Sequence, residues 1–298
     1  MRTVLLTYCL LISKLLMAQS SYEQLEMISI HQLEKEDTLR FDLSGIVEVD
    51  NRYFVISDKV WNRYIYEISL DQNKFNLVQS YFFNAKFRLD LEAIDYCDGY
   101  FYLANEKNGG IYRLNKSDLF DGKGKLELID IPFEDKQLKQ TEWGNAGWEG
   151  LAINCENQIL YLVKERQPRF ILPYDNKSNQ LLPEFDIPNT ESNDFSDAKF
   201  ENGFLYLLER NGNYISKIDP ASGEVIDKKY YGHICSHPEG KLFEPEKYGM
   251  AEALLLKENE IWIGLDNNGI QTSTHATNTY QIKGNNPVII KFKRPKGF

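Results

Sequence analysis

The sequence contains few of the residues on which transition-metal and nucleophilic sites depend. It has four histidines and four cysteines in 298 residues. It has no G-x-S-x-G nucleophile elbow, which argues against nucleophilic serine catalysis. It also has no glycine-rich phosphate loop and no Walker lysine. Basic residues are also in deficit, because 34 Lys and Arg face 44 Asp and Glu. The net charge of −10 argues against nucleic acid and anionic membrane surfaces as partners.

The histidines do not form an evident metal site. His233 and His237 have an H-x-x-x-H spacing that could bind a transition metal on a helix. Pro238 and Gly240 follow, and no third ligand is evident. We therefore interpret this segment as a packed loop.

Long hydrophobic runs are also missing beyond the N-terminus. There, a basic residue precedes an apolar run from Val4 to Ile12 and a small residue at position 18, which is typical of a secretory signal peptide. The run is too short for a membrane anchor, and Lys14 interrupts it. We predict a signal peptide over 1–18, one mature domain over 19–298, and a secreted or periplasmic location with no membrane span.

The dominant feature of the chain is a fivefold repeat of short apolar segments. Each repeat opens with an apolar run, continues with a second run that ends in an acid, and adds a third that ends near a turn. The second residues of the openings are separated by 48, 57, 47 and 56 residues, and they are Ser44, Glu92, Glu149, Ser196 and Glu252. A repeat of about 50 residues made of short strands is typical of a β-propeller blade.

The fold class is therefore all-β: a propeller of five four-stranded blades, with six blades as the alternative. In the first four repeats a fourth strand follows turn residues, at 75–83, 125–133, 181–188 and 224–231. The last repeat supplies only three strands, whereas residues 25–33 alternate as a single strand. We predict that 25–33 pairs with the strand at 288–294, which closes the ring and removes a free sheet edge. No stretch is left for a sixth blade.

Three cysteines follow the predicted cleavage site. Cys97 and Cys155 come after the first strands of neighbouring repeats, and Cys235 stands alone. An oxidising compartment permits a disulfide, but neighbouring blades splay and an odd count leaves one thiol over. We favour three buried or free thiols.

Two series of acids are expected at one mouth of the propeller. The strands of a blade run up and down, so the start of the first and the end of the second lie at the same end. Long connections fall on that face, which marks it as the working face. The first-strand acids are Glu92, Glu149 and Glu252, with Asp194 and Asp197 beside Ser196, and the second-strand acids are Asp58, Glu106, Glu165, Glu209 and Asp266.

Convergent acids predict a cation. Like charges in a narrow channel repel and need a cation, a proton or a bound base. Oxygen-only clusters suit hard cations such as Ca²⁺, which takes roughly 6–8 oxygen ligands. We predict a Ca²⁺ site, with a water-filled polar channel as the alternative. Its candidate ligands are Glu92, Glu149, Glu252 and Asp197.

Several segments resemble a known family. They are LSGI, DLEAI, NAGWEGLA with KERQP, DFSDA with LLER, and AEAL. They resemble the phytase-like ("esterase-like activity of phytase") propellers and are similar to the SdiA-regulated propeller proteins, over about residues 42–294. The resemblance implies a secreted or periplasmic propeller with acidic central residues, bound calcium, and phosphoester or ester hydrolysis.

Two function classes are therefore open. In the first, the protein is a Ca²⁺-dependent hydrolase, and Lys107, Arg166 and Arg210 hold a small anionic ester at the mouth. In the second, it is a non-catalytic binding module whose mouth holds another small ligand or a structural ion. Bases directed into the mouth favour the hydrolase, whereas bases directed between blades favour the binding module. We expect a monomer in both cases.

Overall fold

The computed structural model describes residues 23–35, 40–59, 63–134, 146–235, 241–244 and 250–298. The predicted signal peptide and His237 lie outside these residues. The described part of the histidine segment is a short helix, α5 (Gly232–Cys235), and not the loop that we expected. No helix within the described ranges has the length and apolar character needed to cross a membrane.

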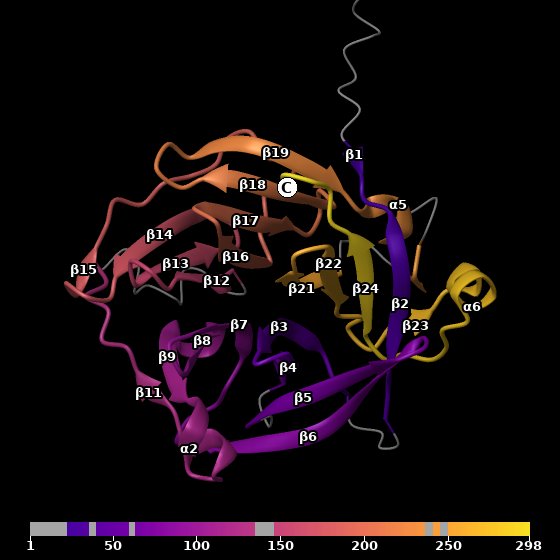
Figure 1. Ribbon diagram of the computed structural model, residues 1–298, viewed down its shortest axis with the longest axis horizontal. Coiled ribbons are helices and arrows are strands. Elements are labelled where there is room, and N and C mark those ends of the chain that lie inside the picture. The colour runs from indigo at the N-terminus through magenta and orange to yellow at the C-terminus, as the bar shows by residue number, and fades with distance from the viewer. Residues whose placement is uncertain (1–22, 36–39, 60–62, 135–145, 236–240, 245–249) are drawn as a thin grey trace, which may run out of the picture.

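The structure is all-β and propeller-like, with antiparallel groups of four strands arranged around a centre (Figure 1). We call these groups units one to five. Unit one consists of β3 (Leu43–Val49), β4 (Arg52–Ser57), β5 (Tyr64–Asp71) and β6 (Lys74–Asn84). Unit two consists of β7 (Leu91–Cys97), β8 (Tyr100–Asn105), β9 (Gly110–Asn115) and β11 (Glu127–Leu128). Unit three consists of β12 (Trp148–Asn154), β13 (Ile159–Lys164), β14 (Phe170–Asp175) and β15 (Gln180–Leu181).

The other two units complete the arrangement. Unit four consists of β16 (Asp197–Glu201), β17 (Phe204–Glu209), β18 (Tyr214–Asp219) and β19 (Glu224–Tyr230). Unit five consists of β21 (Ala251–Leu256), β22 (Glu260–Leu265), β24 (Val288–Lys293) and β2 (Met27–Glu34). The short elements are β1 (Glu23–Gln24), β10 (Gly124–Lys125), β20 (Phe243–Glu244), β23 (Gln271–Thr272), η1 (Glu106–Asn108), α2 (Lys116–Phe120) and α6 (Thr274–Tyr280).

The N-terminal strand closes unit five, as predicted. β2 pairs antiparallel with β24, so that Ile30 lies opposite Ile290. β2 also pairs in parallel with β6 over three residues, which joins units five and one into a nine-stranded sheet. β1 pairs in parallel with β19 of unit four. The N-terminal segment therefore ties three units together by backbone hydrogen bonds.

The hydrophobic core is divided among the contacts between units. One buried cluster lies between each pair of neighbours in the described chain, including units five and one. Phe54 of unit one, for example, meets Phe101 of unit two with ring centroids 5.5 Å apart. Strands that are covered on both faces explain continuous buried runs such as β8, where five of six residues are buried.

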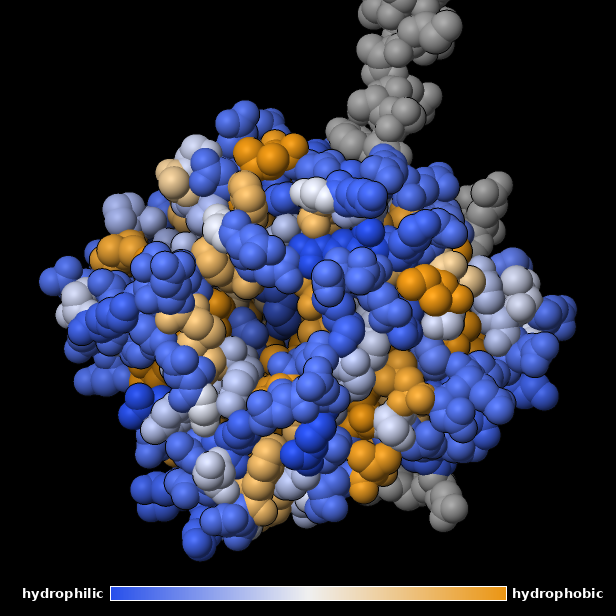
Figure 2. All heavy atoms as spheres, in the orientation of Figure 1, coloured by the Kyte–Doolittle hydropathy of each residue, from blue (hydrophilic) through white to orange (hydrophobic). Residues whose placement is uncertain are grey.

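The innermost strands contact one another in a closed cycle, β3, β7, β12, β16 and β21 (Figure 1). In units one, two and four, a two-residue turn with positive φ joins the innermost strand to the second strand of the same unit. These turns are Asp50-Asn51, Asp98-Gly99 and Asn202-Gly203. Tight turns at this end leave the longer connections for the opposite end. The face seen in Figure 2 is mostly hydrophilic and is hollowed near the middle of the ring.

The expectation of three thiols was wrong. Cys97 and Cys155 form a disulfide with their Cα atoms 5.7 Å apart, and Cys235 is a buried thiol that takes no part in it. Cys97 is the last residue of β7, and Cys155 immediately follows β12. These two innermost strands are neighbours and are in contact. The splay of a propeller grows with distance from the axis, so it does not separate residues this close to the centre.

A thiol count tests this pairing. A protein spanning residues 19–298, unfolded without reductant, should give one thiol with Ellman's reagent, and three after reduction. Cys235→Ser should leave none before reduction. Three reactive thiols in the unreduced wild-type protein would contradict the disulfide.

Candidate functional site

A polar pocket of about 460 Å³ lies at the end of the ring where the innermost strands begin. Among the described residues, its lining contains ten carboxyl groups and two guanidinium groups, those of Arg166 and Arg210. The carboxyl groups are Asp42, Asp58, Asp90, Glu92, Glu106, Glu149, Glu165, Asp194, Glu252 and Asp266. The pocket therefore carries a large excess of potential negative charge.

β-bulges direct the first-strand acids into this pocket. In four innermost strands the ladder to the next strand skips one residue, and these residues are Ser44, Glu92, Glu149 and Glu252. A bulge leaves the extra residue unpaired and re-aims its side chain. A small residue follows each bulge, and Gly150, for example, lies against the backbone of unit four. The predicted convergence of Glu92, Glu149 and Glu252 is therefore present.

Four of the second-strand acids immediately follow their strands and line the pocket, whereas the fifth, Glu209, is the last residue of β17. Glu209 does not line the pocket, because its carboxylate accepts hydrogen bonds from the amides of Glu191 (2.6 Å) and Ser192 (2.8 Å). Sequence analysis also missed Asp42 and Asp90. Each immediately precedes a repeat opening, so the pattern D-L-[SE] was a signal that could have identified both.

Asp197 lies outside the pocket lining. Its buried carboxylate accepts hydrogen bonds from the amides of Ala198 and of Leu254, both at 2.7 Å, and lies 3.5 Å from Nζ of Lys199. Burial raises the pKa of Asp197 to about 7, although Lys199 opposes the shift. Asp197 comes one residue after Ser196, the position that corresponds to the bulged residues of the other units, and it connects units four and five instead of facing the mouth.

The fold brings two of the three predicted anion-binding residues, Arg166 and Arg210, into the pocket and leaves out Lys107. Arg210 contacts Glu252 (2.5 Å), Glu165 and Asp194 (3.5 Å), and so links units three, four and five. Arg166 lines the pocket and pairs with Glu165. Lys107 is exposed and does not line the pocket. The basic groups around this mouth are thus largely engaged with acids of the protein itself.

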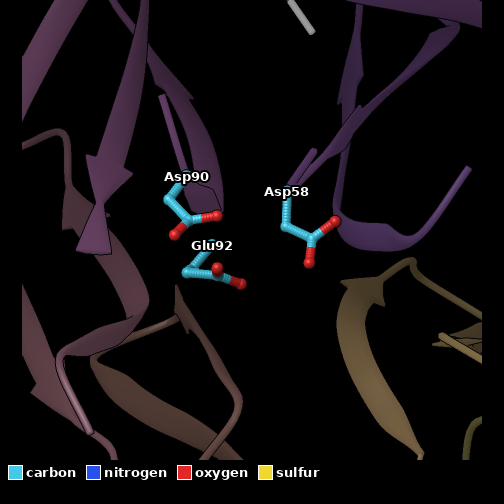
Figure 3. A group of neighbouring side chains, drawn as sticks. All are labelled: Asp58, Asp90 and Glu92. Atoms are coloured by element: carbon cyan, nitrogen blue, oxygen red, sulfur yellow. The ribbon is translucent and has the colours of Figure 1, made fainter. Parts of the chain in front are cut away.

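Two groups of three carboxylates could each hold a metal ion. Within each group, one oxygen per residue lies within 4.8 Å of the other two. The first trio is Asp58, Asp90 and Glu92, and the second trio is Glu106, Glu149 and Glu165. Figure 3 shows the first trio, in which Glu92 points toward Asp58 across the pocket.

Burial and mutual repulsion raise the pKa values of these acids. Burial raises the pKa of Glu92 well above its usual value, and the charge of Glu149 raises it further. Glu149 is shifted in the same direction by burial and then by Glu252. Burial raises the pKa of Asp58 to about 6, although Lys59 at 2.8 Å opposes the shift. At neutral pH the pocket is therefore stabilised by added protons or cations.

The comparisons agree with a propeller-like fold. The family model for SdiA-regulated proteins matches residues 32–229, so the chain belongs to the SdiA-regulated family and this part of the predicted resemblance is confirmed. A search of curated proteins found no match.

Two solved structures are similar in fold. Glutaminyl cyclase from Myxococcus xanthus is 10% identical with a TM-score of 0.56, over 92% of this chain and all of that one. A computationally designed protein, Ika8, is 11% identical with a TM-score of 0.39, over 88% of this chain and 64% of that one. At such identity the cyclase supports the fold alone, and the similarity to Ika8 is too weak to support any inference.

The raised pKa values predict how stability depends on pH. A carboxyl group with a raised folded-state pKa holds its proton more tightly in the folded chain, so stability falls as the pH rises from about 4 through that pKa. For Asp58 this window ends near pH 6. In EDTA, the Asp58→Asn variant should therefore gain stability over the wild type between pH 5 and pH 7.5. A gain on the order of 2 kcal/mol would raise the Tm by roughly 4–8 °C.

The comparison must be made between variant and wild type at each pH. Burial lowers the pKa values of His31 and His233, so these two residues reduce stability as the pH falls through about 6.5 and partly mask the carboxyl effect. Both proteins share the two histidines, so their contribution cancels. An Asp58→Asn variant with the same Tm difference from wild type at pH 5 and pH 7.5 would contradict the prediction.

Proposed function

We propose that the protein is a monomeric, secreted or periplasmic propeller of five blades whose central pocket binds a divalent cation, with Ca²⁺ as the best match. The five core clusters between units support the blade count. The observation that carries the cation proposal is the first trio, in which three carboxylates from units one and two converge. A hard cation prefers such oxygen donors, and the described pocket lining contains neither histidine nor cysteine.

The first trio has oxygens available for a cation. Within the described chain, the carboxylates of Asp90 and Glu92 make no hydrogen bond or ion pair, and Oδ1 of Asp58 is buried without a partner. Lys59 binds the other oxygen of Asp58 and also Asp42 (2.5 Å), so it restrains Asp58 without covering the trio. A bound cation would neutralise these groups and, as a Lewis acid, could polarise an oxygen of a ligand.

The positions of the bases favour a binding module over a phosphoester hydrolase. Arg210 lines the pocket, but its guanidinium group is bound by Glu165 and Glu252, and Lys107 lies outside the lining. Two of the three residues proposed to hold an ester are therefore either paired with acids of the protein or away from the pocket. A neighbouring polar groove of about 740 Å³ shares Arg166, Asp194 and Asn211 with the pocket. This groove offers space for a small polar ligand that reaches a bound cation.

Calcium should stabilise the folded protein. A ligand that binds only the folded state stabilises it by about 2.7 kcal/mol at a hundredfold excess over Kd. Ca²⁺ should therefore raise the Tm of wild type after chelator treatment, and Asp90→Asn and Glu92→Gln should lose most of this increase. Asp197→Asn is the matched control, because this buried acid lies outside the pocket. An unchanged wild-type Tm would rule out the cation proposal.

An activity screen separates the two function classes. The calcium-loaded protein should not turn over phosphoesters or carboxyesters, whether or not a chelator is present. Turnover that is lost on chelation and lost in Arg166→Gln would favour the hydrolase. Turnover that persists after chelation and also persists in Arg166→Gln would indicate a contaminating enzyme.

A further inference from the structure

The second trio lies in the same pocket but on the other side of Glu92. Glu106, Glu149 and Glu165 come from η1, β12 and the residue after β13, so the trio spans units two and three. The proposed cation at Asp58, Asp90 and Glu92 does not involve any of these residues. The second trio therefore has to be neutralised in its own right.

Two buried carboxylates of this trio have oxygens without a partner in the described chain. Glu149 is 7% exposed, and within the described chain its carboxylate makes no hydrogen bond or ion pair although it lines the pocket. Glu165 is 1% exposed, and its Oε2 has no hydrogen-bond partner because Arg166 and Arg210 both bind Oε1. A buried carboxylate oxygen without a partner carries a large desolvation cost. Both residues therefore point to a missing ligand.

The available arginines do not neutralise this side of the pocket. Asp194 and Glu252 add two carboxylates to the trio, and Arg166 and Arg210 bring two positive charges. When all of these groups are ionised, five carboxylates less two guanidinium groups leave a charge of −3. A divalent cation would reduce this to −1.

A hydrogen bond from the backbone holds Glu106 at the second trio. Oε1 of Glu106 accepts a hydrogen bond from the amide of Gly147 at 2.9 Å. A Cβ atom at position 147 would lie 2.5 Å from Cγ of Glu106, so only glycine permits this approach. The glutamate is thus held against the start of β12, where Glu149 follows two residues later.

We propose that the pocket binds two divalent cations, the second of them at Glu106, Glu149 and Glu165. This inference rests on the proposed function, since the first cation belongs to the trio of Asp58, Asp90 and Glu92. Arg210 binds Oε1 of Glu165 and Oε1 of Glu252, and it therefore acts as a fixed counter-ion between the two glutamates. The cation and the guanidinium group therefore use different oxygens of Glu165.

Calcium stoichiometry tests the second site. Protein stripped with a chelator is titrated with Ca²⁺ in a calorimeter, and the bound metal is counted independently by mass spectrometry of the desalted protein. Wild type should bind two equivalents per chain. Glu149→Gln and Glu106→Gln should each bind one, and Asp90→Asn should bind one. The double variant Asp90→Asn/Glu149→Gln should bind none.

The number of calcium ions bound distinguishes failure of the second site from failure of the proposed function. One equivalent in wild type, lost in Asp90→Asn and kept in Glu149→Gln, would overturn the second site and leave the proposed function standing. No binding in wild type would overturn both. Glu127→Gln, an exposed acid on β11, is the control for charge removal and should keep two equivalents. Circular dichroism and calcium-free melting establish that each variant is folded, so that a loss of binding is not a loss of structure.

Discussion

Repulsion among carboxylates that ring closure brings to one mouth is the constraint on which this structure depends. Each unit contributes an acid near the start of its innermost strand, four of the five contribute another after the next strand, and β2 closes the ring by pairing with β24. Closure buries apolar surface between every pair of neighbouring units, and the same closure concentrates ten carboxyl groups around one pocket. The hydrophobic gain and the electrostatic cost therefore come from the same geometry.

The protein reduces this cost in three ways. Arg210 bridges acids of three units, and Lys59 joins Asp42 to Asp58. Buried acids such as Glu149 hold protons more tightly than usual. The remaining charge lies on two trios of carboxylates, and we propose that divalent cations neutralise them. The oxygen-only donors and the net negative charge give hard cations a clear advantage over softer metals.

Unit four departs from the pattern of the other units, and the departure shapes the pocket. Ser196, at the position of the bulged residues of the other units, does not line the pocket. Asp197 binds the backbone of unit five, and Glu209 caps two amides of the preceding loop. Arg210, which follows Glu209, then enters the pocket from this unit as a positive charge. One side of the mouth is consequently less acidic, and the polar groove beside Arg166 and Asp194 opens there.

The sequence by itself determined the strand repeat, the closure by residues 25–33 and the convergence of Glu92, Glu149 and Glu252, because spacing and alternation are properties of the chain alone. Tertiary structure decided where neighbouring units touch and therefore which side chains meet. Cys97 and Cys155 pair because neighbouring innermost strands lie close together. Arg210 pairs with Glu252 and Glu165, which are 42 and 45 residues away in sequence. Asp197 points away from the mouth because it comes one residue after Ser196, at the position that Gly45, Ala93, Gly150 and Ala253 occupy in the other units, and successive side chains of a strand point to opposite faces. A one-residue difference in register reverses the direction of a side chain, and register depends on the partner strand, which no single segment specifies.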